Sequence, residues 1–245
     1  MITKTELKKI LSLDQSTYQV GLKNSSTREI WLEKTLIALS PGLRLLDAGA
    51  GECQFKKYCK HLQYVSQDFA QYDGQGDTVG LQTGKWDNSQ IDIIGDITNI
   101  PENDGSFDVV LEHLPEPAQA LREFSRLLKI GGVLIMTAPF CSLTHFAPYH
   151  FSTGFNKYFY SHHLEKLGFE VIELIANGNF FEFLAQELRR VSDVAQRYCC
   201  AEELYKHEKH AIQIILGMLE RFSAKDSGSE ELLHFDYQVR AVKVR

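Results

Sequence analysis

The sequence predicts an α/β protein built on a mostly parallel, doubly wound β-sheet. Three observations support this prediction. Short apolar segments typical of buried strands alternate with segments whose apolar residues recur at helical spacing. A glycine turn directly follows the first of these strands. The run VLIMTAPF at 133–140 is typical of a strand that is covered on both faces.

The amino-terminal half alternates helix and strand in a regular order. A leucine stripe predicts a helix over residues 27–39, which Pro41 and Gly42 end. Apolar residues of 55–62 again recur at helical spacing and predict a second helix after the glycine turn. Short apolar segments predict strands at 43–46, 63–68, 91–96 and 107–111.

Residues 70–90 interrupt this order. They contain four glycines and no helical period, so we expect a long ordered loop. Loops of this length inside a compact domain are uncommon and often functional. Within it we interpret YDGQGD at 72–77 as the glycine-rich edge of a lid beside Asp68, anchored by Trp86.

The carboxyl-terminal half continues the alternation and then adds helices. We expect helices at 117–132, 161–169, 180–197 and 201–223, and strands at 133–140, 169–174 and 233–245. The last segment alternates polar and apolar residues like an edge strand. The helical insertion at about 178–225 would cap the active site, form a homodimer contact, or simply pack through its apolar side.

Composition and charge exclude several classes of protein. A hydrophobic fraction of 44% with 24% charged residues is ordinary for a soluble globular protein. A net charge of −6 argues against a nucleic-acid partner, and no apolar run is long enough to cross a bilayer. The N-terminus has no signal-peptide pattern, and the five cysteines lack CxxC spacing. We expect free thiols, a cytoplasmic location and no metal site.

The glycine turn in LLDAGAGE is the strongest chemical signal. Gly49 and Gly51 let the backbone approach a ligand closely. Asp68 ends the next strand, 17 residues after Gly51, where a carboxylate can accept hydrogen bonds from both hydroxyls of a ribose. Phe69 offers a flat apolar face, and Asp96 at the end of the third strand could bind the amino group of an adenine.

These residues resemble the class I S-adenosylmethionine (SAM)-dependent methyltransferases, in particular the type 11 methyltransferase domain. The resemblance covers about residues 27–175 and returns at the last strand. It is carried by DAGAG at 47–51, Asp68, Gly95-Asp96, the FDVVL strand and LLKIGGVLIMTAP. One departure is Cys53, where the family often has a third glycine.

The resemblance implies a Rossmann-like, seven-stranded mixed sheet with an antiparallel last strand. It implies that SAM binds with its methionine end at the glycine turn, its ribose at the acid ending the second strand, and its adenine beyond that. The residues concerned are, in this order, Asp47, Gly49, Ala50 and Gly51; Asp68; and Phe69, Asp96 and Ile97.

The same residues leave other readings of the function open. A similar sheet could serve NAD or a nucleotide sugar, although Gln54 stands where a dinucleotide turn would have its third glycine. The fourth strand, FDVVL, also joins EHLPEP about five residues sooner than is usual in the family. A real deletion there would suit a SAM-binding protein that has lost catalysis. We favour a methyltransferase that acts on oxygen or nitrogen of a small molecule, such as a sugar or another metabolite.

Residues 141–169 are rich in aromatic and histidine side chains, and the family uses this region to cover the methyl acceptor. A histidine suits the removal of a proton from an acceptor hydroxyl. The candidates for this role are His145, His150 and then His113. Tyr149, Tyr158 and Tyr160 are the candidate acceptor contacts. Residues 1–245 are expected to form a single domain, with N-terminal helices in 1–40.

Overall fold

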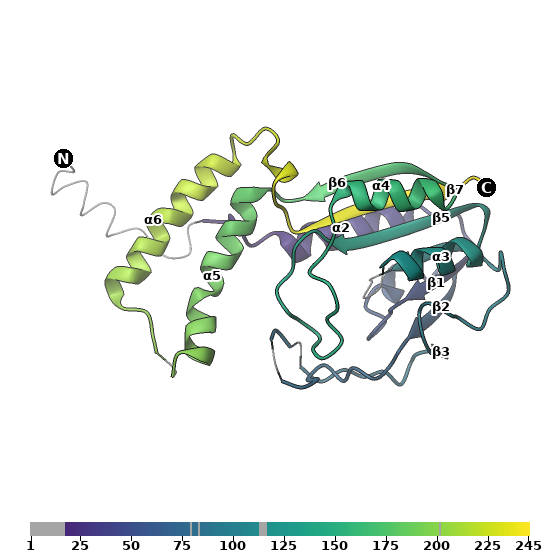
Figure 1. Ribbon diagram of the computed structural model, residues 1–245, viewed down its shortest axis with the longest axis horizontal. Helices are drawn as coiled ribbons and strands as arrows, with labels where there is room; N and C mark the ends of the chain where they lie inside the picture. Colours follow the sequence, from purple (N-terminus) through teal and green to yellow (C-terminus); the bar gives the residue numbers. More distant parts are fainter. Residues whose placement is uncertain (1–17, 79, 83, 113–116, 201) are drawn as a thin grey trace. The chain divides into compact units, whose positions relative to one another are not determined.

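The computed structural model describes residues 18–245 except 79, 83, 113–116 and 201 (Figure 1). These residues divide into two compact units. The larger comprises Arg28–Asn177 and Asp236–Arg245, and the smaller comprises the residues up to Thr27 together with Gly178–Phe235. The prediction of a single domain over 1–245 stays a prediction. His113 lies outside the described residues, as do most of the residues expected to join the fourth strand to the next helix.

The larger unit is built on a seven-stranded sheet with the order β3-β2-β1-β4-β5-β7-β6. Strands β1 to β5 pair in parallel, whereas β7 runs antiparallel to both β5 and β6. The strands are β1 Arg44–Ala48, β2 Gln63–Asp68, β3 Ile93–Ile94, β4 Phe107–Glu112, β5 Leu128–Pro139, β6 Phe169–Asn177 and β7 Asp236–Lys243. The predicted α/β fold, with its mixed sheet and antiparallel last strand, is confirmed.

The interpretation of the last segment as an edge strand is wrong. Strand β7 lies between β5 and β6 and pairs with both. Its alternation has another cause, because Tyr237 and Val239 face the main core while Asp236 and Gln238 are polar yet buried. Period-two alternation shows that the two faces differ, and it does not show that one of them meets water.

Five of the six predicted helices have a counterpart among the described residues. They are α2 Asn24–Ile37, α3 Pro117–Leu127, α4 Lys157–Lys166, α5 Phe180–Tyr198 and α6 Lys206–Ser223, with short 3-10 turns η1 Lys56–Tyr58 and η2 Ser229–Glu231. The predicted helix over 117–132 ends five residues early, because Leu128 already pairs with Phe107 in the sheet. The third strand shrinks from the expected 91–96 to Ile93–Ile94.

The helix predicted over 55–62 is absent from the described structure. A series of turns replaces it, in which backbone N–H groups bond to the carbonyl three residues earlier, as in Leu62 to Cys59. Such turns also bring residues three apart onto one side, so the apolar residues still pack together. Phe55, Tyr58, Cys59 and Leu62 all join the apolar cluster on one face of the sheet.

Two apolar layers sandwich the sheet. One face packs Leu46, Val110 and Met136 against α3 and α4. The other packs Val109 and neighbouring side chains against Leu36 of α2 (Figure 1). Alternate residues of β4 thus enter different layers, as the pleat of a strand requires. Both faces of the sheet are therefore covered by apolar side chains. A ligand of this sheet would bind beyond the ends of the strands.

The smaller unit consists mainly of α5 and α6, which pack against each other. Val20, Ala185, Leu216 and Leu219 form its buried core. The Asn179 side chain caps α5 by accepting hydrogen bonds from the N–H groups of Phe181 and Glu182. The predicted pair of helices in the insertion is confirmed. No described helix has the length and apolar character of a membrane span.

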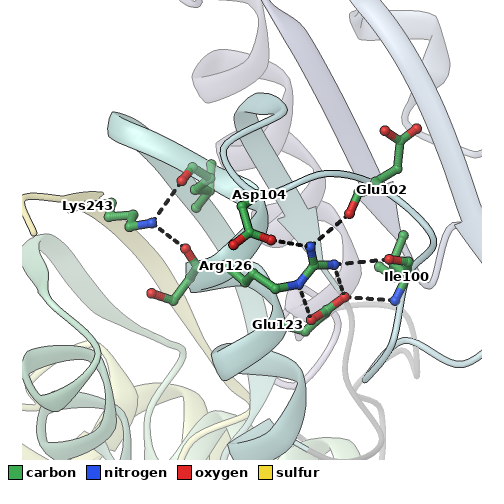
Figure 2. Close-up of polar contacts among 8 residues, drawn as sticks. Ile100, Glu102, Asp104, Glu123, Arg126 and Lys243 are labelled. Carbon is green, nitrogen blue, oxygen red and sulfur yellow. Dashed lines mark hydrogen bonds and ion pairs between the residues drawn. The ribbon is translucent and has the colours of Figure 1, made fainter.

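Arg126 in α3 ties the segment before β4 to the helix (Figure 2). Its guanidinium donates to the Glu123 carboxylate at 2.6 and 2.9 Å and to the carbonyl oxygens of Ile100 and Glu102 at 3.0 and 2.8 Å. The same Glu123 accepts the N–H of Ile100 at 2.8 Å. These bonds satisfy the turns of a segment that has no regular structure and fix it beside the helix.

We expect Arg126→Met to lower the free energy of unfolding by about 2–3 kcal/mol, because two carbonyl groups lose the guanidinium donor and the Glu123 carboxylate keeps only the Ile100 N–H. The control is Lys57→Met, which removes an exposed ion pair to Glu29 of 2.6 Å. Exposed pairs contribute roughly 0–1 kcal/mol. Urea unfolding measures both variants, and equal losses would contradict the importance of the Arg126 network.

Candidate active site

The candidate site lies where the strand order of the sheet reverses. Strands β2 and β3 lie on one side of β1, whereas β4 and β5 lie on the other. In such sheets ligands bind beyond the carboxyl ends of the strands, at the switch point between the two halves. Here the switch point falls between β1 and β4, whose last residues, Ala48 and Glu112, are register partners.

The glycine turn after β1 is bonded to the end of β2. The N–H groups of Gly49 and Ala50 donate to the Gln67 carbonyl at 2.8 and 2.9 Å. The N–H of Gly51 donates to the Asp68 carboxylate at 3.0 Å. Both glycines have positive φ, 74° and 50°, a conformation that side-chain-bearing residues rarely adopt. The structure therefore brings together the predicted cofactor residues of the turn and Asp68.

The remaining cofactor candidates follow β2 and β3. The Gly95 N–H donates to the Asp68 carbonyl at 3.0 Å, which places the end of β3 beside that of β2. Asp96 is exposed, and its carboxylate accepts from the Thr98 N–H and hydroxyl at 2.8 and 2.7 Å. These hydrogen bonds lower the pKa of Asp96. Phe69 is 43% exposed and Ile97 is half-buried.

Asp47 lies beneath the turn in a buried position, 4% exposed. The Tyr64 hydroxyl donates a hydrogen bond to its carboxylate. Burial nevertheless raises the pKa of Asp47 to about 7, since the charged form loses its hydration. The predicted contact with the methionine end of SAM thus belongs to a carboxyl group that already has a partner within the protein.

The raised pKa predicts that the stability of the ligand-free protein depends on pH. Because its pKa is higher in the folded protein than in the unfolded chain, Asp47 favours the folded state in its protonated form. This contribution to stability is complete below about pH 4 and is lost as the pH rises through about 7. At about 1.4 kcal/mol per unit the difference is roughly 4 kcal/mol. Asp47→Asn keeps an acceptor for Tyr64 but cannot ionise. We therefore expect its unfolding free energy to gain on the wild type by up to that amount between pH 4 and 8. Parallel curves would contradict this.

Two loops meet above the turn. The N–H of Leu81 donates to the Thr144 carbonyl at 2.8 Å, and that of Asp77 to the Ala147 carbonyl at 3.2 Å. The rings of Tyr72, Trp86 and Phe146 pack edge to face, with centroids 4.9–5.6 Å apart. The described residues of 69–90 and 140–155 therefore form one connected unit, which we call the double loop.

Glycines allow the double loop to close tightly. A Cβ added at Gly74 would lie 1.5 Å from the Gly84 carbonyl oxygen, and one at Gly76 would lie 1.9 Å from that of Ala147. A Cβ at Gly51 would lie 2.9 Å from the Trp86 ring. Gly74 and Gly76 thus permit close backbone approach, and Trp86 packs directly on the glycine turn.

We expect Gly51→Ala to displace Trp86, since the added carbon meets the ring and the backbone has positive φ. Intrinsic tryptophan fluorescence should report the displacement, because the chain has only two tryptophans. Gly95→Ala is the matched control: nothing lies within 4 Å of the added carbon. A spectrum unchanged in Gly51→Ala would contradict the packing of Trp86 on the turn.

The structure separates the predicted catalytic and acceptor residues into two groups. His145 and His150 are neighbours in the double loop, with ring centroids 4.8 Å apart, and Tyr149 packs edge-on against Phe69 at 5.5 Å. Burial lowers the pKa of His150, and His145 lowers it further. Tyr158 and Tyr160 lie instead on α4, respectively 70% exposed and buried in the main core.

Sequence reasoning missed Glu112 as a site residue. Strand β4 continues through Glu112, which pairs with Ala48 and Met136, and α3 begins at Pro117. The available signal in the sequence was that Glu112 directly follows the apolar run FDVVL. Its side chain is buried at 2% exposure. Burial, with a smaller contribution from the charge of Asp47, raises the pKa of Glu112 well above its usual value.

Comparison with known proteins identifies the domain that contains the candidate site. A family model described as a methyltransferase domain matches residues 46–136. These residues are a methyltransferase domain. They include the glycine turn, Asp68 and Glu112. The described residues contain no group of three or more His, Cys, Asp or Glu side chains that could hold a metal ion.

Curated relatives match only in part. A demethylmenaquinone methyltransferase from Renibacterium salmoninarum is 37% identical over 105 residues, 39% of this chain and 41% of that protein. An uncharacterized 37.1 kDa protein in a transposon of Streptomyces fradiae is 47% identical over 51 residues, 19% of this chain and 15% of that protein. The chain thus spans less than half the length of these relatives.

Solved structures share the fold across most of the chain. The cyclase SpnF matches with a TM-score of 0.53 at 18% identity, over 95% of this chain and 84% of that one. Phosphoethanolamine N-methyltransferase 2 from Haemonchus contortus, solved with SAM, gives 0.51 at 17%, over 89% and 53%. Geranyl diphosphate C-methyltransferase from Streptomyces coelicolor gives 0.50 at 13%, over 90% and 79%. The sheet is that of the class I SAM-dependent methyltransferases.

Proposed function

We propose that this chain is a SAM-dependent methyltransferase, EC 2.1.1.-, that acts on a small-molecule acceptor. The observation that carries the proposal is the hydrogen bond from the Gly51 N–H to the Asp68 carboxylate, inside the matched methyltransferase domain. It joins a glycine turn to an acid at the switch point of the sheet, which suits a nucleoside with a charged tail.

The residues present fit SAM. Each Asp68 carboxylate oxygen accepts one backbone N–H, from Gly51 or from Ala70, and so keeps the capacity to accept a ribose hydroxyl. The exposed Phe69 and the half-buried Ile97 offer apolar surface for an adenine, and Asp96 offers its carboxylate to the amino group. In this proposal Asp47, Gly49, Ala50 and Gly51 hold the methionine end.

The proposed acceptor is a small molecule enclosed by the double loop. The similar proteins with named acceptors methylate demethylmenaquinone, phosphoethanolamine and geranyl diphosphate. Because these differ in chemistry, we leave the acceptor as a metabolite or sugar methylated on oxygen or nitrogen. His145 or His150 would take the acceptor proton, and Tyr149 would contact the acceptor. Tyr158 and Tyr160 stay candidate acceptor contacts on α4. The first is exposed, and the second lies in the main core.

Two further features of the proposal concern the setting of the protein. All five cysteines are free, which suits the cytoplasm. The smaller unit has exposed apolar side chains on both of its helices, among them Val194 and Met218, and a homodimer contact would use them.

A second candidate function is SAM binding without methyl transfer. Only four residues separate β4 from α3, and a real deletion at this point would remove residues that the resemblance places beside the acceptor. The cyclase SpnF has the same fold and is named for another reaction. Fold alone therefore does not decide between the two functions.

A thermal-shift titration tests cofactor binding. We expect SAM and its demethylated product, S-adenosylhomocysteine (SAH), to raise the melting temperature, and NAD to leave it unchanged. Saturation at 100 times the dissociation constant stabilises by about 2.7 kcal/mol. Asp68→Ala should abolish the shift. Asp87 is an exposed acid in the loop that follows β2, and Asp87→Ala should keep the shift. Absence of a shift with both SAM and SAH would sink the proposal.

Turnover separates the two candidates. Protein that binds SAM is incubated with methyl-labelled SAM and a panel of small amines, phenols, sugars and quinols. Transfer of label with formation of SAH supports the methyltransferase. Binding without transfer to any acceptor favours the non-catalytic candidate.

A further inference from the structure

Glu112 occupies the floor of the proposed cofactor site. It is the last residue of β4, and its register partner Ala48 directly precedes the glycine turn. The carboxyl ends of β1 and β4 flank the switch point, where open parallel sheets bind their ligands. Glu112 therefore ends one of the two strands that flank the switch point, and not an outer strand of the sheet.

The carboxyl group of Glu112 lacks a partner among the described residues. It is 2% exposed, and both of its oxygens are buried without a hydrogen bond. Folded proteins leave few buried polar atoms unsatisfied, and each such atom calls for an explanation. A ligand that enters the crevice and supplies the missing partner is one.

The surroundings of Glu112 indicate the charge of that ligand. Among the described residues, the ionisable groups that interact electrostatically with Glu112 are Asp47 of β1 and Tyr160 of α4, both of them acids. Asp236 of β7, which acts on Tyr160, already has a cationic partner, because it lies 3.7 Å from the Arg28 guanidinium. No described lysine or arginine forms an ion pair with Glu112. A cation beside Glu112 would offset the repulsion between the two acids and give the carboxylate a charged partner.

SAM carries a permanent positive charge on sulfur, whereas SAH has a neutral sulfide. We propose that Glu112 provides the counter-charge for the cationic centre of the cofactor, so that the site distinguishes SAM from SAH. This inference rests on the proposed function and adds a residue to it. Once the methyl group has left, the sulfur is neutral and the carboxylate no longer has a charged partner, which favours release of the product.

Proton release follows from this assignment. In the free protein burial, and to a smaller extent the charge of Asp47, raise the pKa of Glu112, which favours the protonated carboxyl. It must lose its proton to pair with a cation. SAM binding should therefore release a proton, and SAM affinity should rise by up to about tenfold per pH unit below the pKa of Glu112. SAH binding should release none.

Calorimetric titration in buffers of different ionisation enthalpy measures both quantities. We expect the wild type to bind SAM at least roughly tenfold more tightly than SAH, with one proton released only for SAM. Glu112→Gln keeps the shape of the side chain without the charge, and should bind both ligands within about threefold and release no proton.

Two further variants make the assignment specific. Asp108→Asn is the matched control. Asp108 lies at the other end of β4, where its carboxylate accepts the backbone N–H of Arg44 and the Lys129 ammonium. This variant should behave as the wild type. Asp47→Asn tests the other buried acid of the crevice, and proton release that persists in it assigns the proton to Glu112 even if Glu112→Gln does not fold.

The failures are distinguishable. Equal affinity for SAM and SAH without proton release in the wild type overturns the role of Glu112 and leaves SAM binding intact. Loss of proton release in Asp47→Asn assigns the proton to Asp47 and also overturns it. Absence of binding by either ligand overturns the proposed function and this inference together.

Discussion

The pairing of β1 with a parallel strand on each side determines the position of the candidate site. β2 brings Asp68 to the level of the glycine turn, and β4 brings Glu112 to the level of Ala48. Because parallel strands end at the same edge, one register fixes three groups that are far apart in the sequence. The Gly51–Asp68 hydrogen bond follows from this register and holds the turn in place.

Buried carboxyl groups are the main electrostatic feature of this edge. Asp47, Glu112 and Asp236 are all nearly inaccessible, and burial is the first cause of the raised pKa of each. Asp47 and Asp236 have hydrogen-bond partners in Tyr64 and Asn177, which offset part of the cost. Glu112 has none among the described residues. Burying these carboxyl groups lowers the stability of the ligand-free protein and favours the binding of a cation. The proposed cofactor carries such a positive charge.

The double loop shows how irregular backbone can be held without helices or strands. Its two segments exchange backbone hydrogen bonds and share a cluster of three aromatic rings. The glycines permit contacts that a side chain would prevent, and Trp86 connects the cluster to the glycine turn. A movement of the double loop would therefore change the packing of Trp86 on the glycine turn.

The sequence by itself determined the α/β class, the order of most elements and the motif residues of the proposed cofactor site. These are encoded locally: apolar periodicity specifies strands and helices, and the glycine turn and Asp68 stand at fixed offsets in one strand–turn–strand unit. Tertiary structure decided the rest. Spacing at three and four residues could not distinguish a helix at 55–62 from successive turns, and alternation could not tell an edge strand from β7, which is paired on both sides. The burial of Glu112, the separation of Tyr158 from Tyr160, and the packing of Trp86 on Gly51 depend on contacts between distant segments. Such contacts leave no local pattern, because the physical environment of a side chain is set by whatever the fold brings beside it.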